Sequence, residues 1–248
     1  FFEFYTKMIH SKNPFEVEKS ALISYEKEAP NKEVPPQFNP YVFNGGNIAV
    51  VQGKDYVVVA GDTRLSLGYG VLARDTTKII QLTDKCVLVS AGMYADFLAL
   101  KKYLHAKIVM YEFDNGKKPN TKACAQLLGT TLYQKRFFPY YCFTAIAGID
   151  EDGKGVCYGY DAVGSFQPVK HGAQGSASTF ITPAMDQILD GYNNLNHKKL
   201  ETKEEVVDVL RDCFNAAAER DIHTGDGVEI MTIDKNGSKL QKFGLRFD

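Results

Sequence analysis

The chain has 248 residues, of which 44% are hydrophobic and 24% charged, and its formal net charge is -1. This composition is typical of a globular protein with a sizeable core, and the charge gives no indication of a nucleic-acid or anionic-membrane partner. No apolar run approaches the roughly 20 residues that a membrane helix needs. The five cysteines are widely spaced and form no CxxC pair, so we expect buried free thiols.

Residues 1–43 are predicted to form an extension and a linker, and residues 44–248 to form the domain. Four prolines separate the two parts, and the extension contains a short helical stretch at 14–28 followed by an extended linker. The segment mixes aromatic and charged residues without an uninterrupted apolar core. It therefore does not resemble a signal peptide. The prolines are Pro30, Pro35, Pro36 and Pro40.

The first half of the domain is predicted to contain two β-hairpins followed by two helices. Runs of β-branched residues indicate the strands, and broad apolar faces at helical spacing indicate the helices. Either Asn120 or Thr121 could cap the second helix. The strands are expected at 48–51, 56–60, 78–82 and 86–90, and the helices at 95–111 and 121–135.

The second half repeats this order and ends in a hairpin. The order of strands, two helices, strands, two helices and strands predicts an α+β fold, a four-layer α-β-β-α sandwich with two antiparallel sheets face to face. The strands are expected at 141–148, 156–160 and 165–170, the helices at 176–192 and 203–220, and the closing hairpin at 228–233 and 240–245.

Several polar residues have two interpretations each. Asp62 follows an apolar strand and could orient a catalytic ammonium or cap a turn. Lys78 could lower the pKa of a nucleophile or simply face solvent. Ser176 could cap a helix or lie beside an active-site amine. Asp221 and Thr224 could bind a chain terminus or a hydroxyl, or end a helix in a tight loop.

The start of the first strand contains no nucleophile. Between Tyr25 and Asp62 there is no serine, threonine or cysteine, and the strand opens with the turn Asn44-Gly45-Gly46-Asn47. Other motifs do not supply a site. The GxGxxA-like string at 68–73 precedes no amphipathic helix, and the acidic turn at 150–153 lacks the length of a calcium loop. The histidines show no zinc-ligand spacing, and G-x-S-x-G does not occur.

Six short sequence motifs in this chain, taken together, resemble those of the β-type subunits of the 20S proteasome. The resemblance extends from about Gln37 to the end of the chain, and it is greatest with the noncatalytic members at the sixth position of the β ring. The resemblance rests on the order and spacing of these motifs rather than on any one of them. The motifs lie at residues 39–46, 61–64, 136–141, 150–155, 161–165 and 218–221.

This resemblance implies a sandwich of the N-terminal-nucleophile hydrolase type. In active members a Gly–Thr bond is cut autocatalytically, the freed threonine is the nucleophile, and its α-amine is the base. Alignment through Asp62 places this position at Gly45 or Gly46, so the nucleophile is lost in either register. The remaining matches are Asp62 and Lys78 to the charge pair, Ser176, Asp221 and Thr224 to the groups around the amine, and Gly92 to the glycine whose N–H stabilises the oxyanion.

The function that the resemblance implies is structural rather than catalytic. The chain would join other β subunits in a seven-membered ring, against the opposing β ring and the adjacent α ring, in cytoplasm and nucleus. It would need no metal or organic cofactor. In relatives much of the segment before Gln37 is a propeptide, and our own hypothesis is that here it lies across neighbouring subunits. Two alternatives stay open. One is an active hydrolase with a displaced nucleophile such as Thr63 or Ser66, and the other is a free adaptor or assembly domain.

Overall fold

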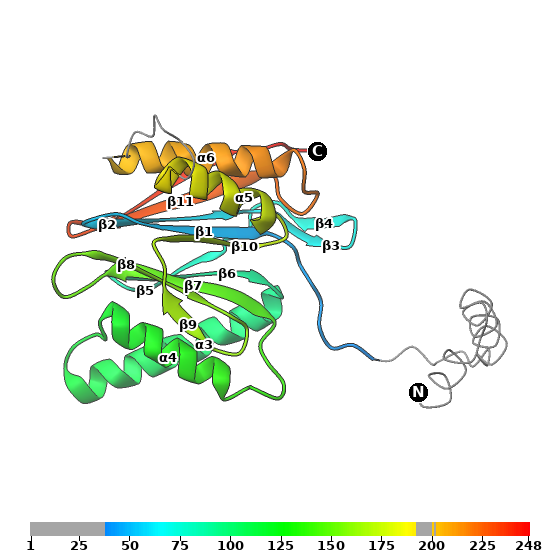
Figure 1. Cartoon of the computed structure of the whole chain (residues 1–248). Coiled ribbons are helices and arrows are strands. Elements are labelled where there is room, and N and C mark those ends of the chain that lie inside the picture. The colour runs from blue at the N-terminus through cyan, green and yellow to red at the C-terminus, as the bar shows by residue number, and fades with distance from the viewer. Residues whose placement is uncertain (1–37, 192–199, 201) are drawn as a thin grey trace, which may run out of the picture. The chain divides into compact units, whose positions relative to one another are not determined.

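The computed structural model describes residues 38–191, 200 and 202–248 (Figure 1). One compact unit, Tyr41–Asp248, contains every element below. The helical stretch expected at 14–28 lies outside the described residues. The boundary expected between residues 43 and 44 stays a prediction.

One five-stranded antiparallel sheet contains both ends of the domain. Its strand order is β10-β1-β2-β11-β12, so the first strand pairs with one from the middle of the chain. Residues in β1 and β2 alternate between two apolar layers: Ala49 and Val58 face one layer, and Ile48 and Val57 the other. The strands are β1 Asn47–Gln52, β2 Tyr56–Asp62, β10 His171–Gly175, β11 Gly227–Asp234 and β12 Gly237–Gly244.

A second five-stranded antiparallel sheet has the order β5-β6-β7-β8-β9. Its central strands carry Val87, Val89, Ala145 and Ala147 on the side that faces the first sheet. A small separate hairpin, β3 Leu65–Leu67 with β4 Gly70–Ala73, projects beyond the sheets. The strands of the second sheet are β5 Ile79–Thr83, β6 Cys86–Gly92, β7 Cys142–Ile149, β8 Gly155–Tyr160 and β9 Phe166–Pro168.

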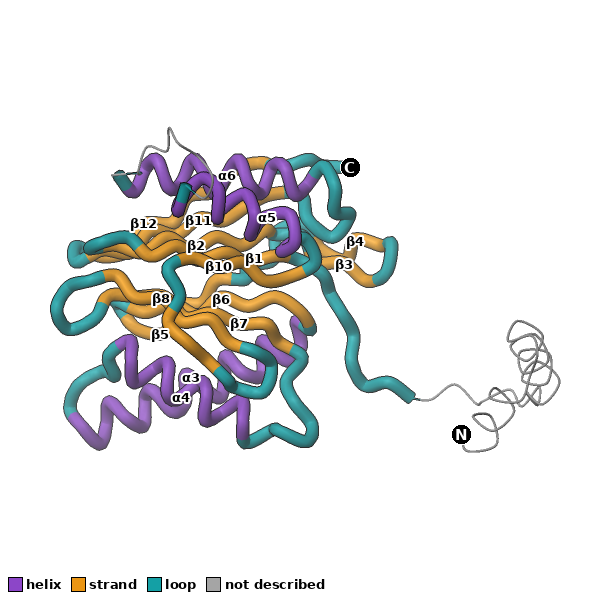
Figure 2. The backbone as a smooth tube through the Cα atoms, in the orientation of Figure 1, coloured by secondary structure: helices purple, strands orange, loops and turns teal. Residues whose placement is uncertain are grey.

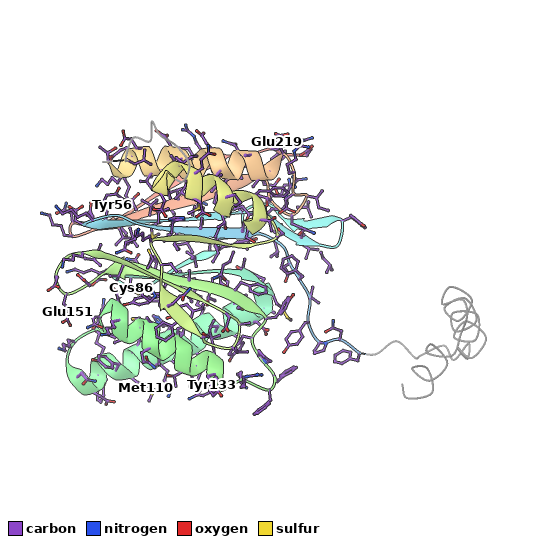
Figure 3. The ribbon with its side chains drawn as sticks, in the orientation of Figure 1. Tyr56, Cys86, Met110, Tyr133, Glu151 and Glu219 are labelled. Atoms are coloured by element: carbon purple, nitrogen blue, oxygen red, sulfur yellow. The ribbon has the colours of Figure 1, made fainter. Side chains whose placement is uncertain are left out.

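Helices cover the outer face of each sheet, as Figures 1 and 2 show. Helices α5 (Ser178–Met185) and α6 (Lys203–Ala218) pack on the first sheet, and α3 (Tyr94–Asn115) and α4 (Thr121–Tyr133) pack on the second. Three apolar clusters thus lie between four layers, which confirms the expected α+β arrangement. Cys86 lies inside the layer between the second sheet and its helices, whereas Met110 and Tyr133 extend outward (Figure 3).

Helix ends follow signals that the sequence carries. Asn120 caps α4, since its Oδ1 accepts the N–H of Ala123 at 2.7 Å, and Gly116 ends α3 at a φ of 68°. Helix α6 begins with a capping box between Thr202 and Glu205. All five cysteines are buried and free, as expected. Within the described residues, no helix is long and apolar enough to cross a membrane.

The region from 165 to 192 differs from the sequence-based expectation. The strand expected at 165–170 is β9 alone, and a further strand, β10, follows it. The helix expected at 176–192 begins only at Ser178 and ends at Met185, where a π-helical turn, η1 (Asp186–Asp190), continues it. Strands β3 and β4 were not predicted either. Glycine-rich β10 and the short β3–β4 hairpin lack the runs of β-branched residues that mark strands.

Candidate functional site

Asp62 and Lys78 form a buried ion pair at the end of β2. The Lys78 Nζ lies 3.3 Å from the Asp62 Oδ1, and the two side chains are 3% and 0% exposed. The same Nζ donates to the backbone carbonyls of Asp62 at 2.7 Å and Arg64 at 2.8 Å. Every hydrogen of the ammonium therefore has an acceptor, which is the arrangement that a buried cation requires.

The Asp62 carboxylate also holds the backbone on either side of it. Its Oδ1 accepts the N–H of Asn47 at 2.6 Å, and its Oδ2 accepts the N–H of Arg64 at 3.2 Å. Burial raises the pKa of Asp62 and lowers the pKa of Lys78, because each charged form loses its hydration, and the opposite charge of the partner works against both shifts. Asp62 thus links the start of β1 to the turn after β2.

Gly46 faces this ion pair. A β-carbon built on Gly46 would lie 2.1 Å from the Lys78 Cε and 3.2 Å from the Asp62 Oδ1. A β-carbon on Gly45 would instead lie 2.6 Å from the His223 Cβ and 2.7 Å from the Ser66 Oγ. The φ angles are 69° at Gly45 and 82° at Gly46, a left-handed region that favours glycine. The two candidate positions therefore have different surroundings, and only Gly46 lies against Lys78.

The side chain of Asn47 joins the other predicted residues into one network. Its Nδ2 donates to the Thr224 Oγ1 at 2.5 Å, the Asp221 Oδ2 at 3.3 Å and the Ser176 Oγ at 3.4 Å. Its Oδ1 accepts the N–H of Ala177 at 2.6 Å. Asn47 is fully buried, so its carboxamide places all of its hydrogen-bonding capacity inside the site.

Asp221 is the acceptor at the centre of this network. The hydroxyls of Ser176 and Thr224 donate to its Oδ2 at 2.5 and 2.6 Å, and the N–H of His223 donates to its Oδ1 at 3.1 Å. Burial alone would raise the pKa of Asp221, but these donors together with Asn47 hold it below its ordinary value. The carboxylate is therefore charged at neutral pH, with only neutral groups bonded to it.

Gly92 ends β6 and has a φ of 109°. A β-carbon there would lie 2.5 Å from the Tyr141 carbonyl oxygen, so a larger residue would collide with the backbone. Its carbonyl accepts the N–H of Asn44 at 3.2 Å, and the Asn44 side chain bonds to Tyr94 N and to the Ser66 carbonyl. The segment before Gly46 is thus fixed beside Gly92.

Thr63 and Ser66, the alternative nucleophiles, are also buried. The Thr63 hydroxyl donates to the Arg74 carbonyl at 2.7 Å. The Ser66 Oγ lies 2.8 Å from the His223 Nδ1 and also bonds to the Asn44 carbonyl at 3.3 Å. Within the described part of the chain, no carboxylate bonds to the His223 ring. The serine and histidine therefore lack the third group that orients the base in a catalytic triad.

The structure brings together all the site residues predicted from sequence, namely Gly45, Gly46, Asp62, Lys78, Gly92, Ser176, Asp221 and Thr224. Two features of the site were not predicted. One is Asn47, for which the only signal was a polar side chain at the start of an apolar strand. The other is Arg64, whose guanidinium pairs with Asp226 through two bonds of 2.7 and 3.1 Å and holds the loop that carries Asp221 and Thr224.

Ser176 shows why its two interpretations could be separated only by geometry. The residue before α5 is Ala177, and Ser178 rather than Ser176 bonds back to the Gly175 carbonyl. The Ser176 hydroxyl points to Asp221 instead. It therefore belongs to the polar network and does not cap the helix. The described residues contain no group of three or more side chains that could hold a metal ion.

Known proteins of one family resemble this chain over most of its length. The family model "Proteasome subunit" matches residues 42–233 of the chain. The chain belongs to the proteasome subunit family. It is 46% identical over 232 residues to "Proteasome subunit beta type-1" of Dictyostelium discoideum, covering 92% of this chain and 98% of that protein.

Other relatives in the proteasome family are equally well covered. The chain is 45% identical over 216 residues to "Proteasome subunit beta type-1" of Arabidopsis thaliana, covering 85% of this chain and 97% of that protein. It is 40% identical over 234 residues to "Proteasome subunit beta type-6" of Saccharomyces cerevisiae, covering 90% of this chain and 97% of that protein. The resemblance to β-type subunits is thereby confirmed, and the chain is a proteasome β subunit similar to β type-1 members.

Proposed function

We propose that this chain is a noncatalytic, structural β subunit of the 20S proteasome core. The observation that carries the proposal is the position of Gly46, which faces the buried Asp62–Lys78 pair without a hydroxyl or thiol. The chemistry of a terminal nucleophile needs a hydroxyl or thiol on that residue.

The surroundings of the two glycines support Gly46 as the lost position. Among active members the nucleophile lies beside a lysine and an aspartate, and here Lys78 and Asp62 are the nearest atoms to a β-carbon on Gly46. The atoms nearest to Gly45 belong to His223 and Ser66. The Lys78 side chain lies in the space that a threonine side chain at residue 46 would fill.

Asn47 supports the same proposal at the place where active members hold their terminal amine. Ser176, Asp221 and Thr224 match the groups that surround the terminal amine in active members, and here the Asn47 carboxamide donates to all three. A neutral amide thus gives the Ser176 and Thr224 oxygens a donor and gives Asp221 one donor more. We infer that Asn47 lets the site keep its packing without an amine.

The proposed role is assembly. The chain would hold its neighbours in a seven-membered β ring, contact the opposing β ring and the adjacent α ring, and form part of the chamber wall, in cytoplasm and nucleus. No metal or organic cofactor would take part. The relatives named above as subunits of the proteasome support this role, since the match extends over most of both chains.

Native mass measurement tests the assembly role. A particle purified through a tag on this chain should contain other α and β chains of the proteasome. A chain recovered only as a monomer or as a homo-oligomer would contradict the role and would favour a free adaptor.

Separate Gly46→Thr and Gly45→Thr variants test the assigned position. If the surrounding groups remain competent, only Gly46→Thr should yield a new N-terminus that a threonine-directed covalent inhibitor labels. Labelling of Gly45→Thr alone would contradict the assignment to Gly46. The overlap at Gly46 involves the end of the Lys78 side chain, so labelling of the Gly46→Thr variant requires that this side chain shift.

A second candidate is a serine hydrolase that uses Ser66, because the Ser66 Oγ lies 2.8 Å from the His223 Nδ1. Ser66 is 2% exposed, so a substrate could reach it only if the segment around Asn44 moved. A Ser66→Ala variant separates the two candidates. It should leave every peptidase activity of the particle unchanged, whereas loss of one activity would favour Ser66.

A further inference from the structure

The chain contains three Asn–Gly pairs, at residues 44–45, 115–116 and 236–237. In such a pair the glycine nitrogen can attack the asparagine Cγ, so that an N–C bond forms, the amide C–N bond breaks and ammonia leaves. Water then opens the resulting succinimide to aspartate or isoaspartate. The reaction needs no oxidant or enzyme, but it requires a carboxamide that is free to rotate toward the next nitrogen.

The folded chain prevents this rotation at Asn44. The Asn44 Nδ2 donates to the Ser66 carbonyl at 3.1 Å, and its Oδ1 accepts the N–H of Tyr94 at 3.0 Å. Gly45 is buried, with the Cβ of His223 next to it. Both atoms of the carboxamide would have to lose their partners before the ring could close.

Asn115 is exposed but is also held. It is the last residue of α3, and its Nδ2 donates to the Tyr111 carbonyl at 2.9 Å. The nitrogen that would attack belongs to Gly116, and its N–H donates to the Glu112 carbonyl at 2.8 Å as part of the helix C-cap. Helix unwinding would therefore have to precede the reaction.

The carboxamide of Asn236 has no such partner, although the N–H of Gly237 bonds to the Asp234 carboxylate. Asn236 is exposed in the two-residue turn between β11 and β12, and its side chain bonds to none of the residues that the structure describes. Its backbone N–H donates to the Asp234 Oδ1 at 2.7 Å, which fixes the turn without holding the carboxamide. No atom lies within 4 Å of the space that a β-carbon on Gly237 would fill.

We propose that Asn236–Gly237 is a site of spontaneous deamidation in the native protein, and that the fold protects the other two pairs. The product adds one negative charge beside Asp234, whose carboxylate pairs with the Lys203 Nζ at 2.8 Å. An isoaspartate also lengthens the main chain within the turn that pairs Asp234 with Gly237. The modification therefore changes both the charge and the geometry of an exposed hairpin.

Peptide mass spectrometry of the native full chain, aged in mildly alkaline buffer, tests the proposal. Since two hydrogen bonds of the Asn44 carboxamide must break first, aspartate and isoaspartate at residue 236 should form roughly 10-fold faster than at residue 44, or more. Residue 115 should also react more slowly than residue 236. Equal rates at the three positions, or no product at 236, would overturn the proposal.

Two controls connect the result to the folded structure. In denaturant the three pairs should react at similar rates, and an unchanged preference for residue 236 there would show that the fold is not its cause. An Asn236→Gln variant should abolish the acidic species that ion-exchange chromatography separates from the aged chain. Persistence of that species in the variant would place the modification elsewhere and overturn the assignment.

Discussion

Asn47 connects the two polar groups of the site at the scale of a single residue. Its backbone N–H bonds to Asp62, and its side chain bonds to Ser176, Asp221 and Thr224. Residue type alone did not reveal this role, because a lone asparagine at a strand start is common in turns. The role depends on β1 pairing with β10, which places Asn47 opposite Gly175.

An Asn47→Ala variant should lower the free energy of unfolding by about 1–3 kcal/mol, because Ala177 N loses a buried acceptor and Asp221 loses a donor. Chemical denaturation of the full chain measures this. Asn115→Ala removes one exposed amide contact and is the matched control, with an expected change of at most about 0.5 kcal/mol. Equal losses in the two variants would contradict the importance of the Asn47 network.

A Lys78→Met variant should lose more free energy of unfolding than Asn47→Ala. Removal of one partner leaves the Asp62 carboxylate buried and unpaired, which typically costs about 3–5 kcal/mol of unfolding free energy. Adding Asp62→Asn to the same chain should recover part of the loss. Lys118→Met, which breaks the exposed pair with Asp84, should cost at most about 1 kcal/mol. A Lys78→Met loss as small as that of Lys118→Met would contradict the importance of the buried pair.

Acid should destabilise the loop that carries Asp221 and Asp226. Both carboxylates have a pKa below the ordinary value of 3.8, because burial, which would raise it, is outweighed by hydrogen bonds from Ser176 and Thr224 to Asp221 and from Arg64 and Arg74 to Asp226. Their contribution to stability is therefore complete above pH 3.8 and is lost as the pH falls through the lower folded values. Across this pH range, the free energy of unfolding should fall more steeply in the unchanged chain than in an Asp221→Asn variant. Identical slopes in the two chains would contradict this.

The proximity of the expected site residues could be predicted, but the register of the lost nucleophile could not. Asp62, Lys78, Ser176, Asp221 and Thr224 were expected from the family resemblance, and the fold brings them together. Gly45 and Gly46 are the same residue type, so no sequence argument chooses between them. Their β-carbon directions differ, and those become visible only when the backbone is folded.

At the scale of elements, strands rich in β-branched residues and helices with polar caps were the easiest to predict. Strands β1, β2, β6 and β7 and helix α4 lie close to their expected positions. Strand β10 was not predicted, because His171–Gly175 contains two glycines and no β-branched residue. Its strand conformation comes from pairing with β1, a contact between distant parts of the chain.

Close packing of α4 on the second sheet gives a prediction at this scale. A β-carbon on Gly148 in β7 would lie 2.3 Å from the Lys85 carbonyl oxygen and 2.7 Å from the Thr121 Oγ1, so Gly148→Ala should cost about 1–3 kcal/mol of unfolding free energy. Gly172→Ala in β10, where no atom lies within 4 Å, is the matched control and should change stability little. Thermal melting of both variants checks this, and similar melting temperatures would contradict it.

At the scale of the whole molecule, the four layers were predictable because hydrophobic patterns alternate between strand and helix periods along the chain. The structure adds that the site forms where β1, β2 and β10 of one sheet meet Gly92 at the end of β6 in the other. The framework therefore remains that of the proteasome family, while Gly46 carries no reactive side chain.

The most direct test is intact-mass measurement of every subunit after the assembled particle reacts with a covalent inhibitor directed at terminal threonines. We expect adducts on the active β subunits and an unchanged mass for this chain. An inhibitor adduct on this chain would contradict the proposal that it is noncatalytic.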